Sequence, residues 1–314
     1  MIDADALRLA LLRADPKLSK FNPLPRILCF DDFDNGVNGW CELIGNTDGN
    51  LDNMARYVRD FHPAQLSTCT YFDQGTHGPM SGTYALKAAT RPVPDHMAVL
   101  CKRLTWQDLG PVQMEMYFSY KSEWNFEPVP EGGREWDGNY HPSEAQFGDI
   151  MIGNDIQIDD EGRRTHCALR YVNADAQGNL IRRWKYKTSL QVTRRTIRDM
   201  FPDDYLEHPL EDFQVQDPAD WEDVPDGYQP LCYNEIPSKV NWHYLRWVFD
   251  IGRGRNVELQ VNDKVMDLRD IPVPVHDSPY WGLARLLNLE INVRTRVPVR
   301  NFLYVDSLLI SADW

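Results

Sequence analysis

Apolar and polar residues alternate along most of the chain with a period of two. Every second residue from Val112 to Tyr120 is apolar, whereas Gln113, Glu115 and Ser119 lie between them. Successive side chains of a β-strand point to opposite faces, so this pattern predicts a strand with one buried face. By the same reasoning, with Gly, Asn, Asp and Pro turns as boundaries, we predict strands at 26–33, 40–44, 67–72, 83–89, 97–105, 145–158, 166–173, 180–187, 242–251, 256–261, 286–296 and 302–311.

About a dozen strands with almost no helix predict an all-β fold, a two-sheet antiparallel β-sandwich. The one expected helix covers residues 3–13, where apolar residues recur at helical spacing. Tight turns are predicted at 174–179 and 261–265, which contain Asn, Asp or Gly. We therefore predict an N-terminal helical extension at 1–25, followed by a single sandwich domain at 26–314.

Two stretches interrupt the strand pattern. Residues 122–144 contain three prolines, three glycines and two tryptophans, and residues 199–240 contain six prolines and many acids. Long loops of this kind line binding sites or are mobile. We predict that these two excursions form the rim of a site.

Composition excludes several classes of function. The 314 residues carry 33 Lys and Arg against 47 Asp and Glu, a net charge of −14, which disfavours nucleic acid and anionic membrane surfaces as partners. The first twenty residues have only a short apolar run, unlike a signal peptide, and the chain has no run of about 18 apolar residues. A cytoplasmic location is the resulting expectation.

The six cysteines are widely spaced, with no Cys-x-x-Cys pair and no close histidine. This is a poor zinc pattern. Five of the six lie in apolar, strand-like surroundings, so we expect reduced thiols in the core.

Three stretches resemble one family of sandwiches: FDDFDNGVNGW at 30–40, the strands at 242–269 and those at 286–311. Their succession is similar to that of concanavalin-A-like jelly rolls, which occur in bacterial glycoside hydrolases, polysaccharide lyases, lectins and carbohydrate-binding modules. The likeness covers about 26–312 and lies in the order of strands, because no diagnostic catalytic motif matches. It implies a carbohydrate-related function.

The resemblance also implies a structural metal site. It would bring Asp31 and Asp32, on the first strand, towards Asp306 on the last, where related modules hold Ca²⁺ through hard oxygen ligands. The alternative is that Asp31 and Asp34 shape the turns around Asn35-Gly36 and Asn38-Gly39 and that Asp306 accepts backbone hydrogen bonds. No organic cofactor is expected.

Sandwiches of this type bind sugars on the concave sheet, so polar and aromatic residues that share a strand face are candidates. Aromatic rings stack on sugars, and planar polar groups bind their hydroxyls or carboxylates. A solvent-facing sheet surface that binds no ligand and is stabilised by cross-strand ion pairs would show the same sequence pattern. For the strand at 180–187, two sets of residues remain possible on the side that faces the ligand. One set includes Trp184 and Tyr186, and the other consists of Arg183, Lys185 and Lys187. The predicted substrate-binding residues are Arg170, Trp184, Tyr186, Trp242, Arg246, Asn292 and Arg294.

The chemistry of cleavage is less defined. A glycosidase needs two carboxyl groups that flank the bond, and no strand of this chain carries the alternating acids typical of hydrolases with this fold. A lyase-like mechanism needs a Tyr or His base and a basic group for a uronate. The candidate catalytic residues are His166, Tyr244 and Glu290.

Charge changes sign abruptly in the second half of the chain. Residues 163–198 hold ten Lys or Arg and one acid, whereas residues 199–226 hold eleven acids and no Lys or Arg. The acidic segment either covers the basic strands as a lid or protomer contact, or leaves them open to an anionic ligand. Two separate solvated faces are the third interpretation.

Together these observations favour a protein that binds or cleaves an oligosaccharide or glycoside on its concave sheet. The alternative is a noncatalytic sugar-binding sandwich, or one that forms a homo-oligomer through its acidic segment. The partner expected in the first case is a small saccharide.

Overall fold

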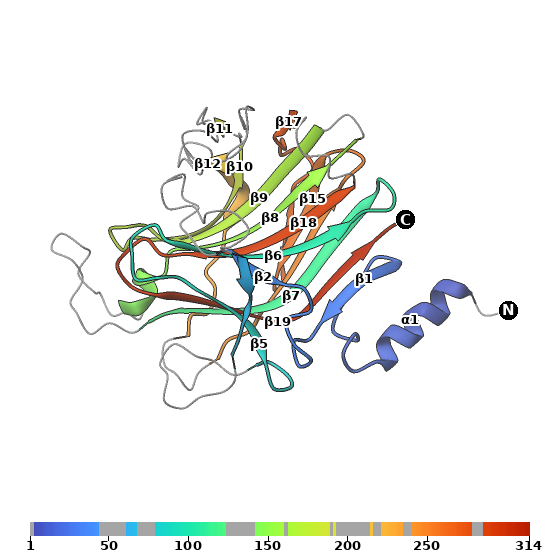
Figure 1. Ribbon diagram of the computed structural model, residues 1–314, viewed down its shortest axis with the longest axis horizontal. Coiled ribbons are helices and arrows are strands. Elements are labelled where there is room, and N and C mark those ends of the chain that lie inside the picture. The colour runs from blue at the N-terminus through green and yellow to red at the C-terminus, as the bar shows by residue number, and fades with distance from the viewer. Residues whose placement is uncertain are drawn as a thin grey trace, which may run out of the picture.

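The computed structural model describes residues 3–43, 61–67, 79–123, 142–159, 163–188, 191–192, 214–215, 221–234, 240–277 and 285–314. Within these ranges the chain folds into two stacked antiparallel sheets, so the predicted all-β sandwich is confirmed (Figure 1). The predicted excursion at 122–144 lies mostly outside the described residues, as does much of 199–240.

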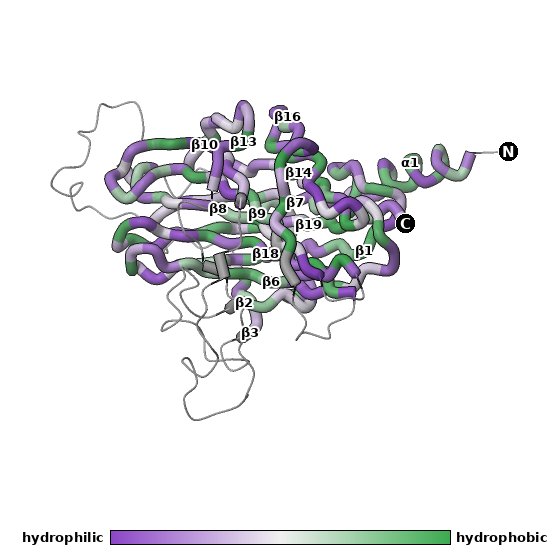
Figure 2. Tube along the Cα trace, turned by 90° about the horizontal axis from the view of Figure 1, so that it is seen from above, coloured by the Kyte–Doolittle hydropathy of each residue, from purple (hydrophilic) through white to green (hydrophobic). Residues whose placement is uncertain are grey.

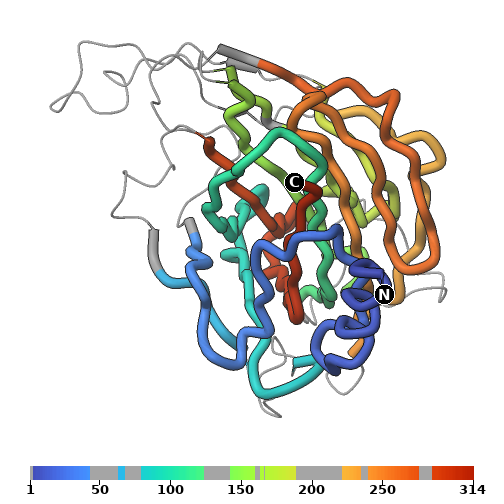
Figure 3. Tube along the Cα trace, turned by 90° about the vertical axis from the view of Figure 1, so that its right-hand side faces the viewer, coloured from blue at the N-terminus to red at the C-terminus, as the bar shows by residue number. Residues whose placement is uncertain are grey.

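Sheet A contains eight strands in the order β16-β15-β14-β7-β19-β5-β4, with β1 also paired to β19. The first and last long strands of the chain therefore lie side by side, as Figure 3 shows. The strands are β1 (Arg26–Asp31), β4 (Gln65–Ser67), β5 (Ala85–Ala89), β7 (Pro111–Ser122), β14 (His243–Asp250), β15 (Arg255–Val261), β16 (Lys264–Asp267) and β19 (Asn301–Ala312).

Sheet B contains nine strands in the order β13-β10-β9-β8-β18-β6-β2-β3, with β17 also paired to β9. They are β2 (Cys41–Leu43), β3 (Phe61–Pro63), β6 (Met97–Thr105), β8 (Asp149–Gln157), β9 (Arg163–Ala174), β10 (Leu180–Lys187), β13 (Trp221–Tyr228), β17 (Val275–Asp277) and β18 (Leu286–Arg294). A separate short pair consists of β11 (Gln191–Val192) and β12 (Gln214–Val215).

The core lies between the two sheets and follows from the alternation along each strand, which Figure 2 shows as changes of hydropathy along the chain. Met114, Met116 and Phe118 of β7 face it from sheet A, and Leu289 and Ile291 of β18 face it from sheet B. All five are fully buried. Since every second residue points the other way, each sheet also presents a polar outer face.

Two helical segments complete the described fold: α1 (Ala4–Ala14) and a 3₁₀ turn, η3 (Pro142–Gln146). The helix was expected at 3–13, and the Asp3 carboxylate caps it by accepting a hydrogen bond from the Asp5 amide at 3.4 Å. None of its residues is buried, and it projects from the sandwich (Figure 1). No helix of the described residues is long and apolar enough to cross a membrane.

Strand β13 lies where the sequence predicted only a loop. The residues of β13 include Pro225 and three acids, yet they pair with β10 at one edge of sheet B. An edge strand tolerates proline and exposed charge because only one of its sides must pair.

Candidate functional site

The outer face of sheet B carries a dense group of polar side chains. On β18, Leu287, Leu289, Ile291 and Val293 face the core, so Glu290, Asn292 and Arg294 share the opposite face, as the alternation predicted. The Cα register extends this face across β8 and β9, where Asn292 pairs with Met151 and Met151 pairs with Arg170. The candidate residues Arg170, Asn292 and Arg294 therefore lie together.

One row of this face crosses the sheet through two small residues. Glu290 pairs with Gly153 of β8, and Gly153 pairs with Ala168 of β9. Lys187 comes next in the row, because it follows Tyr186, whose partner on β9 is Leu169. The row thus places a carboxyl group and an ammonium group on either side of a floor that has almost no side chain.

Glu290 has an unusual proton affinity. Burial, and then the negative charge of Asp155, raise its pKa to about 7, while the Lys187 ammonium and the Asn292 amide act in the opposite direction. Asp155 is the Cα partner of Asn288, diagonal to Glu290, and it is paired with the Arg164 guanidinium, whose Nε lies 2.9 Å from Oδ1. A carboxyl group that exchanges its proton near neutral pH suits acid–base chemistry.

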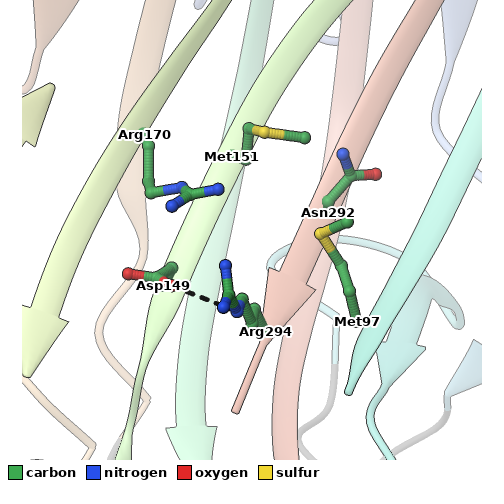
Figure 4. Close-up of a pocket in the computed structure, with 6 residues that line it drawn as sticks. All are labelled: Met97, Asp149, Met151, Arg170, Asn292 and Arg294. Carbon is green, nitrogen blue, oxygen red and sulfur yellow. Dashed lines mark ion pairs between the residues drawn. The ribbon is translucent and has the colours of Figure 1, made fainter. Parts of the chain in front are cut away.

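Next to this row lies a shallow depression, shown in Figure 4. Asn292 is 1% exposed, and neither atom of its amide makes a hydrogen bond of normal geometry. Buried polar groups are nearly always hydrogen-bonded, so an amide of this kind indicates a missing partner. Charged groups surround it: Arg294 lies 2.8 Å from Asp95, and Asp149 lies 2.8 Å from Arg296. The depression is lined by Met97, Asp149, Met151, Arg170, Asn292 and Arg294.

The same face carries a small apolar cluster separate from the core. Its members are Met97, Val99, Met151, Ala168 and Trp221, each buried, with Cys101 packed against them. The guanidinium carbon of Arg170 lies 4.0 Å from the Trp221 ring centroid, a cation–π contact. The site therefore combines an apolar surface with charged and amide groups, the usual chemistry of small-ligand sites.

Comparison with known proteins places the chain in a family. The model of that family, described as "Domain of unknown function (DUF6772)", matches residues 8–314. The chain belongs to the DUF6772 family. No curated protein matches it.

Several solved structures are similar to this DUF6772 chain. The carbohydrate recognition domain of Emp47p is 9% identical, with a TM-score of 0.42, over 94% of this chain and 100% of that one. A carbohydrate esterase, vb_24B_21 from the Shiga toxin-encoding bacteriophage phi24B, is 10% identical, with a TM-score of 0.40, over 92% and 99%. Peanut lectin is 7% identical, with a TM-score of 0.38, over 90% and 96%. At these scores the likeness carries no argument about function, which depends on the residues of the DUF6772 chain itself.

Two candidate residues lie on the other side of the sandwich. Tyr244 and Arg246 belong to β14 of sheet A and point away from the core, so they do not meet Glu290 and Asn292. The Tyr244 hydroxyl donates to Glu115 at 2.5 Å, and burial raises its pKa well above the usual range. Arg246 is paired with Glu258, and Trp242 immediately precedes the same strand.

The two aromatic candidates of β10 face the core. Trp184 is fully buried and its indole N–H donates to Gln229 at 3.3 Å, and the Tyr186 hydroxyl donates to Glu222 at 2.7 Å. The alternative set of this strand, which includes Lys187, lies on the outer face. His166 lies on β9 opposite Asp155, but its side chain lies outside the described residues.

The predicted calcium site is not supported. Asp31 lies next to the last strand, as expected, but its carboxylate accepts hydrogen bonds from Lys102 at 2.5 Å and from the Trp40 indole at 2.9 Å. Asp32 is paired with Lys17. No group of three or more His, Cys, Asp or Glu side chains in the described ranges could hold a metal ion.

The third candidate ligand, Asp306, accepts from the backbone amides of Met80 at 2.7 Å and Ser81 at 3.0 Å. Asp34 similarly accepts from the amides of Thr83 and Tyr84, at 2.5 and 3.1 Å. Asp306 therefore accepts backbone hydrogen bonds, as the alternative interpretation expected, whereas Asp34 binds the amides of a segment far along the chain instead of shaping the Asn-Gly turns.

The basic and acidic segments meet at the edge of sheet B. The acidic strand β13 pairs with the basic strand β10, and Asp223 lies 3.1 Å from Arg183 and 2.8 Å from Lys185. The described end of the acidic segment thus extends the sheet as an additional strand. Residues 193–213 and 216–220 lie outside the described part of the chain.

Sequence reasoning missed several residues of the site, among them Asp149, Gly153, Asp155, Lys187 and Trp221. Asp149 and Asp155 are six residues apart in one strand, so they share a face by the same alternation that identified Glu290. Lys187 belonged to the alternative set for its strand. Nothing local indicated that Trp221 lies in a strand.

Proposed function

We propose that the outer face of sheet B binds a carbohydrate, with the ligand seated over the depression beside Glu290. The observation that carries the proposal is the buried Asn292 amide, which makes no hydrogen bond of normal geometry although it lies close enough to Glu290 to lower the pKa of that carboxyl group. A sugar hydroxyl both donates and accepts, so it is a suitable partner for an amide.

The surroundings of Asn292 support the same class of ligand. Met151 and Ala168 offer apolar surface to the C–H face of a sugar ring, and the guanidinium groups nearby suit hydroxyl or carboxylate oxygens at its edge. This combination of one apolar face and a polar rim is the chemical character of a pyranose.

Titration calorimetry with methyl α- and β-glycosides of glucose, galactose, mannose and glucuronic acid tests the proposal. We expect saturable binding of at least one glycoside, weakened about tenfold or more in Asn292→Ala, the cost of roughly one buried hydrogen bond to the ligand. The unfolding midpoint of the variant is expected to stay near that of the wild type, because the amide makes no hydrogen bond of normal geometry.

Arg246→Ala serves as the matched control, because Arg246 lies on the outer face of sheet A. Its affinity for the glycoside is expected to equal that of the wild type, whereas Arg294→Ala weakens binding. Absence of binding to the entire panel, or equal loss in both arginine variants, would contradict the proposal.

A second candidate function is cleavage of the bound glycoside, which the proton affinity of Glu290 favours. Protonated Glu290 would donate to the leaving oxygen. Asp155, its diagonal neighbour on the next strand, would be the second carboxyl group, since glycosidases use a pair of carboxyl groups that flank the bond. Release of nitrophenol from p-nitrophenyl glycosides by the wild type, but not by Glu290→Gln, would establish this function.

A further inference from the structure

Gly153 lies in the middle of β8, a central strand of sheet B, where glycine is an unfavourable choice. Glycine weakens a strand because it has no side chain to pack and loses the most backbone freedom on folding. A glycine inside a strand therefore has one of three explanations. Its backbone adopts a conformation that other residues disfavour, a neighbouring backbone leaves no room for a Cβ atom, or the missing side chain has a function.

The other described glycines have structural reasons. Of these nine, five have a positive φ, which other residues rarely adopt. Each of the remaining four has a backbone oxygen within 3.1 Å of the position that a Cβ would take. For Gly148, the carbonyl oxygen of Arg294 lies only 2.4 Å from that position.

Gly153 has neither reason. Its φ is not positive, and, among the described residues other than its chain neighbours, a Cβ built there would meet nothing closer than the carbonyl oxygen of Cys167, at 3.5 Å. The next atoms are Oε2 of Glu290 at 3.7 Å and the Cβ of Ala168 at 3.8 Å, both ordinary van der Waals distances. Alanine would fit at this position and should stabilise the strand.

The space that glycine leaves is next to the reactive group of the site. It is bounded by the Glu290 carboxylate on one side and the Ala168 methyl on the other, in the row that leads to Lys187. Glycine in a strand marks positions where a ligand approaches the backbone closely.

We infer that Gly153 is a specificity-determining residue, whose missing side chain lets one ring of a saccharide lie on β8 with a hydroxyl or glycosidic oxygen against the Glu290 carboxyl. This inference rests on the proposed carbohydrate site and identifies the point of closest approach within it. The apolar surface of Ala168 and Met151 continues the floor on which the ring lies.

The experiment compares the wild type with Gly153→Ala and Gly153→Val, using the methyl glycoside that the wild type binds best. Thermal unfolding and titration calorimetry are measured on the same preparations. We expect an unfolding midpoint equal to or above that of the wild type in Gly153→Ala, together with an affinity at least tenfold lower. Gly153→Val, with two more methyl groups towards Glu290, is expected to abolish binding.

Gln260→Val is the control for adding a β-branched residue to a strand away from the site, since Gln260 lies on β15 of sheet A. It should leave glycoside affinity unchanged. Unaltered affinity in Gly153→Ala would overturn the inference while the proposed function stands. A lower unfolding midpoint in Gly153→Ala would also overturn it, because the glycine would then have a structural role. If the wild type binds none of the glycosides, the proposed function fails and the inference fails with it.

Discussion

At the scale of single residues, Glu290 links stability to pH. Its pKa of about 7 in the folded chain compares with an ordinary value of 4.5, so the folded state holds a proton that the unfolded state releases. Between these two values the unfolded state binds fewer protons, and the free energy of unfolding therefore falls as pH rises. The loss is complete well above pH 7 and amounts to roughly 3–4 kcal/mol, since one pKa unit is worth about 1.4 kcal/mol.

Glu290→Gln removes this titration, so we expect the variant to gain stability relative to the wild type as pH rises from 5 to 8. Urea unfolding of both proteins at pH 5, 6, 7 and 8 measures the difference at each pH, which cancels the contributions of other groups. A difference that is constant with pH would show that Glu290 ionises normally in the folded protein.

Prediction of single residues from the sequence succeeded where the alternation of apolar and polar positions was enough to assign a side chain to one face of its strand. Glu290, Asn292 and Arg294 share one face of β18 for that reason. It failed on β10, where the register shifts between Leu180 and Arg183 and Arg182 has a φ of 52°. Alternation gave two possible faces for this strand, and burial of Trp184 in the core decided between them. The large apolar surface of tryptophan favours the core over the outer face.

At the scale of elements, a buried ion pair joins the two sheets. Lys102 of β6, in sheet B, donates to Asp31 of β1, in sheet A, and also to the backbone carbonyl of Asn38 at 3.0 Å. Both charged side chains are less than one-tenth exposed. A buried carboxylate that loses its cation keeps the full cost of its desolvation.

Lys102→Met is therefore expected to lower the free energy of unfolding by about 3–5 kcal/mol, the usual cost of removing one partner from a buried pair. The double variant Asp31→Asn with Lys102→Met should recover a large part of that loss, because no charge then remains buried. Urea unfolding measures both. Equal stability of the single and double variants would mean that Asp31 is solvated without Lys102.

Added Ca²⁺ or a chelator should leave the wild-type midpoint unchanged, since Asp31 and Asp32 each have a lysine partner.

Which strands exist was largely predictable, but which sheet each joins was not. β14 and β18 both show the alternation of a half-buried strand, and the sequence of neither indicates its sheet. Pairing of β14 with β7 and of β18 with β6 and β8 joins segments more than one hundred residues apart. Tyr244 and Glu290 were therefore assigned to one site although the fold places them on opposite outer faces.

At the scale of the whole molecule, one hydrophobic cluster spans both sheets. Trp247 of sheet A and Trp184 of sheet B belong to it, together with Trp40, and each is at most 1% exposed. Neither sheet retains its buried face without the other, so the two should unfold together. A single domain over residues 26–314 therefore remains a prediction, which a common unfolding transition of the two sheets would test.

We expect tryptophan fluorescence and far-ultraviolet circular dichroism to report one coincident transition in urea. Fluorescence follows the packing of the buried indoles, whereas dichroism follows the backbone of both sheets, so separate midpoints would show that the sheets lose structure independently. A variant that lacks residues 1–14 is the control: α1 has no buried residue, so its removal should leave the midpoint unchanged.

Ligand binding stabilises only the folded state. A glycoside bound to sheet B should therefore raise the fluorescence midpoint and the dichroism midpoint equally, although part of each signal comes from sheet A. An increase confined to one probe would mean that the ligand stabilises sheet B alone and that the sandwich is not one cooperative unit.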